Sequence, residues 1–146
     1  MAREYTVRMG AYDIGKWEFR EVEALARRYR DMKRRADVLE KCKAPGIHGE
    51  EYAAMKWECS LVEQAAHEVA EKRRRPGGRC TWETALIRAC CDGVVYEDID
   101  PADMPTSNRN EFYEARREFF FRLWVLRQKQ LGMVVMKTER PDECNA

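Results

Sequence analysis

The sequence predicts an all-α protein in which an N-terminal antiparallel helical hairpin packs with a C-terminal helix-turn-helix-like unit. Apolar residues recur every three or four positions over Lys16–Lys41, Glu51–Arg75 and Arg109–Gln130, which is the spacing of one helix face. Glycine and proline interrupt the chain between these stretches, at Ala44-Pro45-Gly46 and Pro76-Gly77-Gly78. We therefore expect one domain over 1–146, with the hairpin at 16–75, the helix-turn-helix-like unit at 81–130 and a tail at 133–146.

Length and charge limit the classes of function. The chain has 146 residues, the size of one domain, and 45% of them are hydrophobic, so it can bury a core. Its 27 basic and 26 acidic residues give a net charge of +1, so only local clusters of charge argue for nucleic acid. No apolar run reaches the length of a membrane span, and the first ten residues lack the apolar core of a signal peptide. We expect a cytoplasmic protein with no membrane partner.

The cysteines and carboxylates do not predict a metal site or an active site. No two cysteines have the CxxC spacing of a zinc ligand pair, and neither His48 nor His67 stands near a pair of cysteines. We expect no metal and no cofactor, and cysteines that are small buried hydrophobes or exposed thiols. The carboxylates lie in helical patterns of alternating sign, which are usually solvated faces. With no phosphate loop or nucleophile elbow in the sequence, we expect no enzyme.

Local signals set the ends of the first two helices. Residues 1–14 show no clear period and predict a loose arm, after which Asp13 can cap a first helix that reaches about Cys42. Glu50 and Glu51 suit the first turn of the second helix, because negative charge is favourable at that end of the helix dipole.

The C-terminal half begins with a third, short helix that Thr81 can cap, and Gly93 ends it near the position where a left-handed residue is common. The segment Val94–Ile99 predicts a brief helix or a short strand. Asn108 can then cap the last helix, with Glu111 reaching back in a variant of the capping box. After that helix, 133–136 is predicted to be extended.

The order of short helix, Gly93, Val94–Ile99, turn and Asn108–Phe121 resembles the helix-turn-helix in the fourth conserved region of bacterial sigma factors. More closely, the chain resembles small prophage regulators of the RinA and ArpU kind, which have a helical N-terminal half with a tyrosine-rich motif. Gly15–Glu21 and Arg28-Tyr29 stand where that motif falls, and Asn108–Phe121 matches the Asn- and Arg-rich helix with paired aromatics. Asp100-Pro101 interrupts the pattern, so we expect a short or displaced positioning helix.

The resemblance implies a set of DNA-binding residues at the start of the last helix. Asn108 and Asn110 would read adenine and Arg109 guanine, because the first turn of a recognition helix faces base edges. The remaining contacts would go to phosphates, from Thr106, Ser107, Tyr113, Arg116 and Arg117. A helix cap is an equal alternative for Asn108, and a core aromatic is the alternative for Tyr113. The run Arg73, Arg74, Arg75 with Arg79 is a secondary basic patch or a charged helix end.

Two functions follow from these patterns. The first is a phage-type transcriptional regulator that binds promoter DNA, RNA polymerase or both, in the cytoplasm of a host bacterial cell. The alternative is a small phage or mobile-element protein that binds and inhibits a host protein or nucleoprotein complex, for example an anti-defence inhibitor. The near-neutral net charge of the chain and the interruption of the positioning helix at Asp100-Pro101 favour the alternative. A homodimer is compatible with both.

Overall fold

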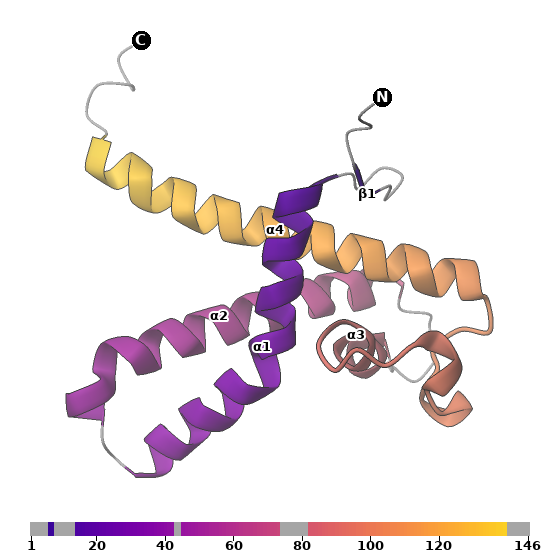
Figure 1. Ribbon diagram of the computed structural model, residues 1–146, viewed down its shortest axis with the longest axis horizontal. Helices are drawn as coiled ribbons and strands as arrows, with labels where there is room; N and C mark the ends of the chain where they lie inside the picture. Colours follow the sequence, from indigo (N-terminus) through magenta and orange to yellow (C-terminus); the bar gives the residue numbers. More distant parts are fainter. Residues whose placement is uncertain (1–5, 8–13, 43–44, 74–81, 140–146) are drawn as a thin grey trace.

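The computed structural model describes residues 6–7, 14–42, 45–73 and 82–139 and has an all-α architecture, as predicted (Figure 1). Four helices pack on one another, and the described strands are a two-residue antiparallel pair near the N-terminus. The elements in order are β1 (Thr6–Val7), β2 (Ile14–Gly15), α1 (Lys16–Lys41), α2 (Pro45–Lys72), α3 (Trp82–Cys90), the 3-10 turns η1 (Tyr96–Asp98) and η2 (Pro101–Asp103), and α4 (Arg109–Glu139).

Helices α1 and α2 form the N-terminal hairpin (Figure 1). The bounds of α1 are those predicted, and its N-cap is Gly15, which makes no side-chain cap hydrogen bond. Asp13, the predicted cap, and Thr81, predicted to cap α3, lie outside the described residues. Helix α2 begins at Pro45, earlier than expected from the sequence. Proline is suited to the first turn because its missing N–H would have no helical partner there, so Pro45 starts a helix instead of only ending one.

Helix α4 crosses the whole molecule and packs on α1, α2 and α3 (Figure 1). It begins at the predicted residue, but it runs on through Gly132 to Glu139, so the expected extended segment at 133–136 is helical. One glycine within a helix costs only about 1 kcal/mol relative to alanine, and the chain on either side continues the helix.

The core lies where α4 crosses the hairpin. Phe112, Ala115, Phe119 and Leu123 of α4 are buried at one residue per helical turn, as the apolar stripe predicted. Small residues of α2 let the helices approach closely, among them Ala65, Ala66 and Ala70. The buried aromatics hold the first half of α4 in a fixed orientation.

The segment between α3 and α4 contains no α-helix. Two 3-10 turns stand where a helix-turn-helix has its positioning helix, in agreement with the short positioning helix expected from Asp100-Pro101. The Asp100 side chain accepts a hydrogen bond from the Ala102 amide at 2.9 Å and so starts η2 at Pro101. Because this cap begins a new turn at 100–101, η1 cannot continue through it.

Gly93 ends α3 with a positive φ of 73°, as predicted for the residue after the helix. The Val94 amide donates to the Arg88 carbonyl across it, at 3.1 Å. A Cβ at Gly93 would collide with the guanidinium of Arg27 from α1. The glycine is therefore required both by the backbone turn and by the close approach of α1.

Candidate nucleic-acid interface

The first turn of α4 is capped as the sequence indicated. The side-chain oxygen of Asn108 accepts hydrogen bonds from the amides of Asn110 at 2.9 Å and Glu111 at 3.2 Å. The Thr106 hydroxyl donates to the Glu111 carboxylate at 3.0 Å and accepts from the Asn108 amide at 3.1 Å. Asn108 is thus a helix cap, and its acceptor oxygen is already used by the backbone.

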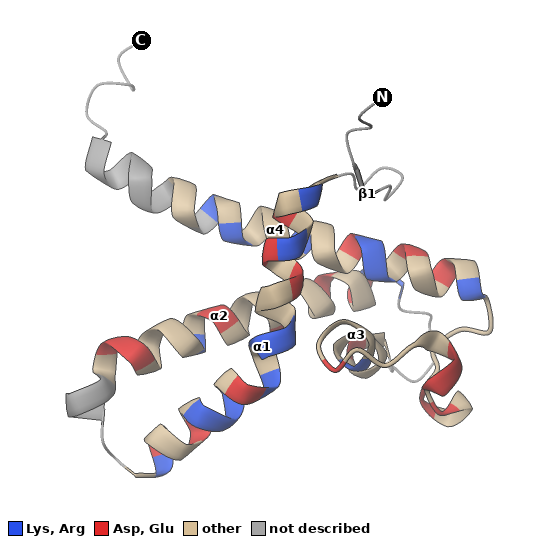
Figure 2. Ribbon diagram, viewed as in Figure 1, with Lys and Arg blue, Asp and Glu red and all other residues tan. Residues whose placement is uncertain are grey.

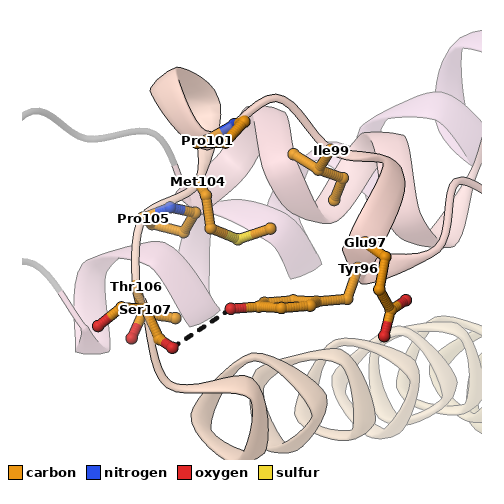
Figure 3. A pocket seen from close by; sticks show the side chains of 8 residues that line it. All are labelled: Tyr96, Glu97, Ile99, Pro101, Met104, Pro105, Thr106 and Ser107. Atoms are coloured by element: carbon orange, nitrogen blue, oxygen red, sulfur yellow. Dashed lines mark hydrogen bonds between the residues drawn. The ribbon is translucent and has the colours of Figure 1, made fainter.

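The residues around this cap point to solvent. Ser107, Asn108, Arg109 and Asn110 are all exposed, and Thr106 is half-buried beneath them. The backbone of the approach is fixed from η1, because the hydroxyl of Tyr96 donates to the Ser107 carbonyl at 3.3 Å (Figure 3). A rigid support therefore presents four consecutive exposed residues, with the polar side chains of Asn108, Arg109 and Asn110 among them.

A groove lies beside this turn, between η1, η2 and the segment that leads into α4 (Figure 3). Its volume is about 420 Å³. The Tyr96 ring forms its floor, and the side chains of Ile99 and Met104 lie on the other side of the ring from α4. The groove is lined by Tyr96, Glu97, Ile99, Pro101, Met104, Pro105, Thr106 and Ser107.

Three predicted residues line up along one side of α4, in what we call the basic-aromatic stripe: Arg109, Tyr113 and Arg116. The Arg109 guanidinium lies 5.4 Å from the centre of the Tyr113 ring. The Arg116 guanidinium lies 5.5 Å from the centre of the Phe120 ring, which packs edge-on against Phe19 of α1. The stripe places two cations over aromatic rings, and these cations are of a type that binds a phosphate backbone.

Glu97 of η1 forms an ion pair with Arg109, the first cation of the stripe. Its carboxylate lies 3.0 Å from the Arg109 guanidinium, and both side chains are more than half exposed. A side-chain hydrogen bond with Tyr113 and the charge of Glu97 raise the pKa of Arg109, so this arginine stays charged. Tyr113 is half-buried against Tyr96 and Phe112, so its ring is partly a core aromatic, as the alternative interpretation stated.

Arg27 of α1 and Arg116 of α4 both lie near the C-terminal end of α3. The Arg27 guanidinium lies against Gly93. Burial raises the pKa of the Cys90 thiol, and the charges of Arg116 and Arg27 lower it to a smaller extent. No carboxylate in the described part of the chain forms an ion pair with either arginine. We call Arg27 and Arg116 the arginine corner.

The outer face of α4 has mixed charge. Asn110, Glu114 and Arg117 are exposed and follow one another at helical spacing. Arg117 therefore lies on this outer face and not on the side of the helix that carries the stripe. Figure 2 shows the same alternation of acidic and basic residues along the first half of α4. Two adjacent arginines of the sequence, Arg116 and Arg117, therefore face different surroundings.

The predicted secondary basic patch is represented by Arg73, since Arg74, Arg75 and Arg79 lie outside the described residues. Arg73 is 11% exposed, stacks on the Trp82 ring at 5.7 Å and pairs with Glu118 at 2.8 Å. Arg73 therefore belongs to the interior, which neither the basic-patch nor the helix-end interpretation predicted.

Glu118 was expected on a solvated face with the other carboxylates, and that expectation is wrong. Its side chain is fully buried between α2 and α4. Lys72 approaches it at 3.3 Å and Arg122 at 2.6 Å, and Arg122 also pairs with Glu68 at 3.1 Å. Desolvation raises the pKa of Glu118, but hydrogen bonds from Arg73, Arg122 and Lys72 outweigh it and leave this pKa below its usual value. We call these five residues the Glu118 network.

The described cysteines match their expected roles. Cys59, Cys90 and Cys91 are buried, and Cys42 is exposed. Burial raises the pKa of the Cys91 thiol to about 12, so it stays protonated. Among the described residues, no three side chains of histidine, cysteine or carboxylate type gather as metal ligands, and no helix there has the length and apolar character to cross a membrane.

Sequence reasoning missed Arg27 and Glu97 as neighbours of the site. Both were visible only as members of charged stretches, and nothing in their spacing indicates contact with α4. Gly93 was the one local signal, because a glycine after a helix can permit a close approach.

The chain matches no protein-family model, no curated protein and no solved structure. Its function is therefore inferred from the geometry described above.

Proposed function

We propose that the protein is a phage-type transcriptional regulator that binds duplex promoter DNA through the N-terminal half of α4. The observation that carries the proposal is the basic-aromatic stripe, which begins at an exposed, capped helix terminus held rigidly by the core. The resemblance to prophage regulators of the RinA and ArpU kind points the same way. The protein would act in the cytoplasm of a host bacterium, where RNA polymerase is a further partner, and a homodimer would suit a two-fold operator.

Each residue has a physical role under this proposal. Arg109 and Asn110 would contact base edges, since the first turn of a recognition helix enters the major groove. Tyr113 and Arg116 would contact the backbone further along the helix, together with Arg117 on the outer face. Asn108 would act mainly as a cap, because its acceptor oxygen is bound by the helix amides. Thr106 and Ser107 would place hydroxyl groups beside a phosphate.

Fluorescence anisotropy with labelled promoter fragments from the protein's own locus tests the proposal. We expect the wild type to bind them with an affinity that falls steeply as salt rises, because phosphate contacts release counterions. Asn110→Ala should cost about 1–3 kcal/mol of discrimination between cognate and altered sites, and Arg109→Ala should also relax base preference. Arg34→Ala is the control, because Arg34 is exposed on α1 and, within the described residues, forms an ion pair with Asp31 alone, at 3.7 Å. An absence of salt-dependent affinity for every duplex would end the proposal.

A second candidate function is inhibition of a host protein or nucleoprotein complex. The mixed charge of Asn110, Glu114 and Arg117 favours it, because alternating charges complement a protein surface better than a phosphate backbone. Trp17 is 70% exposed, with Lys16 and Arg20 over its ring at 5.2 and 5.1 Å, and an exposed tryptophan is a common anchor of protein interfaces. This function takes the place of the first if wild-type protein binds no duplex.

A further inference from the structure

The groove between η1, η2 and the segment that leads into α4 is apolar and has a fixed shape. Its floor is the Tyr96 ring, which packs on the Phe112 ring with 5.3 Å between their centres and is held at its hydroxyl by the Ser107 carbonyl (Figure 3). Pro101 and Pro105 also line it, and proline restricts the backbone. The volume of about 420 Å³ lies within the range of about 300–1,000 Å³ that is usual for ligand pockets. A groove that is already formed costs little to order when a partner binds.

The same segment concentrates negative charge. From Cys91 to Asn108 the sequence contains five carboxylates and no lysine or arginine, although basic and acidic residues are almost equal in number over the whole chain. These five residues are Asp92, Glu97, Asp98, Asp100 and Asp103. The last four of them belong to η1 and η2 or lie between the two turns, and so they surround the groove.

Part of this charge is not compensated within the described residues. Glu97 pairs with Arg109 at 3.0 Å, and Asp103 pairs with Arg88 at 3.4 Å. Asp98 and Asp100 are exposed and form no ion pair in the described part of the chain. One oxygen of Asp100 accepts from the Ala102 amide, and this hydrogen bond leaves the negative charge in place. Asp98 and Asp100 each stand between two residues that line the groove, so two carboxylates remain for a cation at its edge.

We propose that the groove binds a segment of a partner protein in which a lysine or arginine stands beside an apolar side chain. The apolar side chain packs on Tyr96 and Met104, and the cation pairs with Asp98 or Asp100 at the edge. The carboxylates repel the phosphate groups of nucleic acid and of anionic lipid, so neither of these is the occupant. The proposal goes beyond the DNA binding proposed for α4 and does not depend on it.

Selection from a library of short peptides of random sequence tests the proposal on the full chain. We expect the peptides enriched on the wild type to combine lysine or arginine with apolar residues. Enriched peptides are synthesised with a fluorescein label, and their affinity is measured by anisotropy over a range of salt concentrations. Affinity should fall as salt rises, because the ion pair at the edge is exposed to solvent.

One double variant tests the charge. Asp98→Asn with Asp100→Asn removes two carboxylates, and asparagine at 100 keeps an oxygen that can cap η2. The peptides should bind several-fold more weakly to it, with less dependence on salt. Asp31→Asn with Asp37→Asn is the matched control, because both residues are exposed on α1 and the same charge is removed. Equal losses in the two double variants would indicate general electrostatics and would overturn the proposal.

A second comparison tests the apolar contact. Met104→Ala shortens one wall of the groove and should weaken binding several-fold while leaving the salt dependence unchanged. Val38→Ala removes an exposed apolar side chain of α1 and should bind the peptides as the wild type does. Thermal melting checks that each variant folds. If Met104→Ala does not fold, amide chemical shifts of the wild type during a peptide titration decide, and they should change mainly within 95–107.

Four results would overturn the proposal: no enrichment of any peptide, enriched peptides without a basic residue, affinity that Met104→Ala does not change, or chemical-shift changes that lie elsewhere. If Trp17→Ala abolishes binding and Met104→Ala does not, the partner uses the exposed tryptophan of α1 instead. Peptide binding is measured without DNA. A protein that binds these peptides and no duplex therefore keeps this proposal and loses the DNA function, and the reverse result does the opposite.

Discussion

Two groups of arginines, each with one member on α4, differ in their supply of carboxylates. In the Glu118 network, Arg73 and Arg122 share one fully buried carboxylate, and Glu68 provides a second for Arg122. In the arginine corner, Arg27 and Arg116 have no carboxylate partner in the described chain. The same side-chain type thus stabilises the fold where its charge is compensated and stays available for an external anion where it is not.

Burial gives the Glu118 network its importance. A buried ion pair adds little net stability, because desolvation of both charges offsets their attraction. Removing one member is costly all the same, since it leaves the others buried without compensation. The corner carries no such penalty, because Arg116 is only partly buried and Arg27 is exposed.

The largest effect should come from Glu118→Ala. This change leaves Arg73 nearly buried and without its carboxylate partner Glu118. We expect the free energy of unfolding to fall by about 3 kcal/mol. This is the low end for a broken buried ion pair, because Lys72 and Arg122 reach solvent. Urea denaturation measures it. Glu114→Ala, an exposed residue one turn away, should stay within about 0.5 kcal/mol of wild type. Equal stability of the two variants would contradict the structural role of the network.

Arg122→Ala and Arg116→Ala sharpen the comparison on one helix. Removing Arg122 should lower the free energy of unfolding by about 1.5 kcal/mol, because hydrogen bonds to charged groups are lost, and should leave affinity for duplex DNA unchanged. Removing Arg116 should do the reverse, lowering affinity for all sequences and reducing its salt dependence while stability changes less. Removing Arg117 as well should weaken binding further. Urea denaturation and fluorescence anisotropy on the same samples measure stability and affinity side by side. A loss of affinity in Arg122→Ala would contradict the distinction between a stabilising Arg122 and a DNA-binding Arg116.

The stability of the fold should depend on pH in the acid range. The pKa of Glu118 is below its usual value, so its contribution to stability is complete above the unfolded value of about 4.3 and is lost as pH falls through the lower folded value. Desolvation raises the pKa of Glu63, but hydrogen bonds from Lys33 and Tyr29 outweigh it and leave this pKa below its usual value. Glu63 therefore contributes to the pH dependence of stability with the same sign as Glu118. Stability should therefore fall below about pH 4.3.

Glu118→Gln isolates the part that belongs to the network. Its stability, measured by denaturation at several pH values, should fall less steeply in acid than that of the wild type, with a remainder from Glu63. Glu114→Gln should keep the wild-type slope, since Glu114 is exposed. An unchanged slope in Glu118→Gln would show that the buried carboxylate does not titrate in this range.

The smallest effect should come from Glu97→Gln. This change releases Arg109 from Glu97, its carboxylate partner among the described residues, and makes it more like the corner arginines. Affinity for duplex DNA should therefore rise a few-fold at low salt and less at high salt. Asp98→Asn, the adjacent exposed carboxylate, is the control for the loss of one negative charge. Equal gains in both variants would indicate general electrostatics instead of the Arg109 pair.

The parts of the fold that the sequence predicted depend on neighbours in the chain. The bounds of α1, the start of α4 at the Asn108 cap, the turn at Gly93 and the short segment after Asp100 all follow from local signals. The start of α2 and the end of α4 were missed for a related reason. Pro45 and Gly132 are read as interruptions, yet each is tolerated at its position in a helix.

The site was predictable only in part. Helical spacing could place Arg109, Tyr113 and Arg116 on one side of α4, but it could not separate Arg116 from Arg117 by what each faces. Arg73 was equally ambiguous between a surface patch and a helix end. Its partner Glu118 lies 45 positions further along the chain, and no local pattern reports a pairing over that distance.

By itself the sequence determined the approximate positions of the helices, the Asn108 cap and the apolar stripe of α4, because hydrogen bonds and side-chain periods within a few residues set them. Tertiary structure alone decided which charges are compensated. The crossing of α4 over α2 buries Glu118 among Lys72, Arg73 and Arg122, and the approach of α1 to Gly93 brings Arg27 to the end of α3. Electrostatic energy depends on distance in space and on exposure to water, and neither is written in the order of the residues.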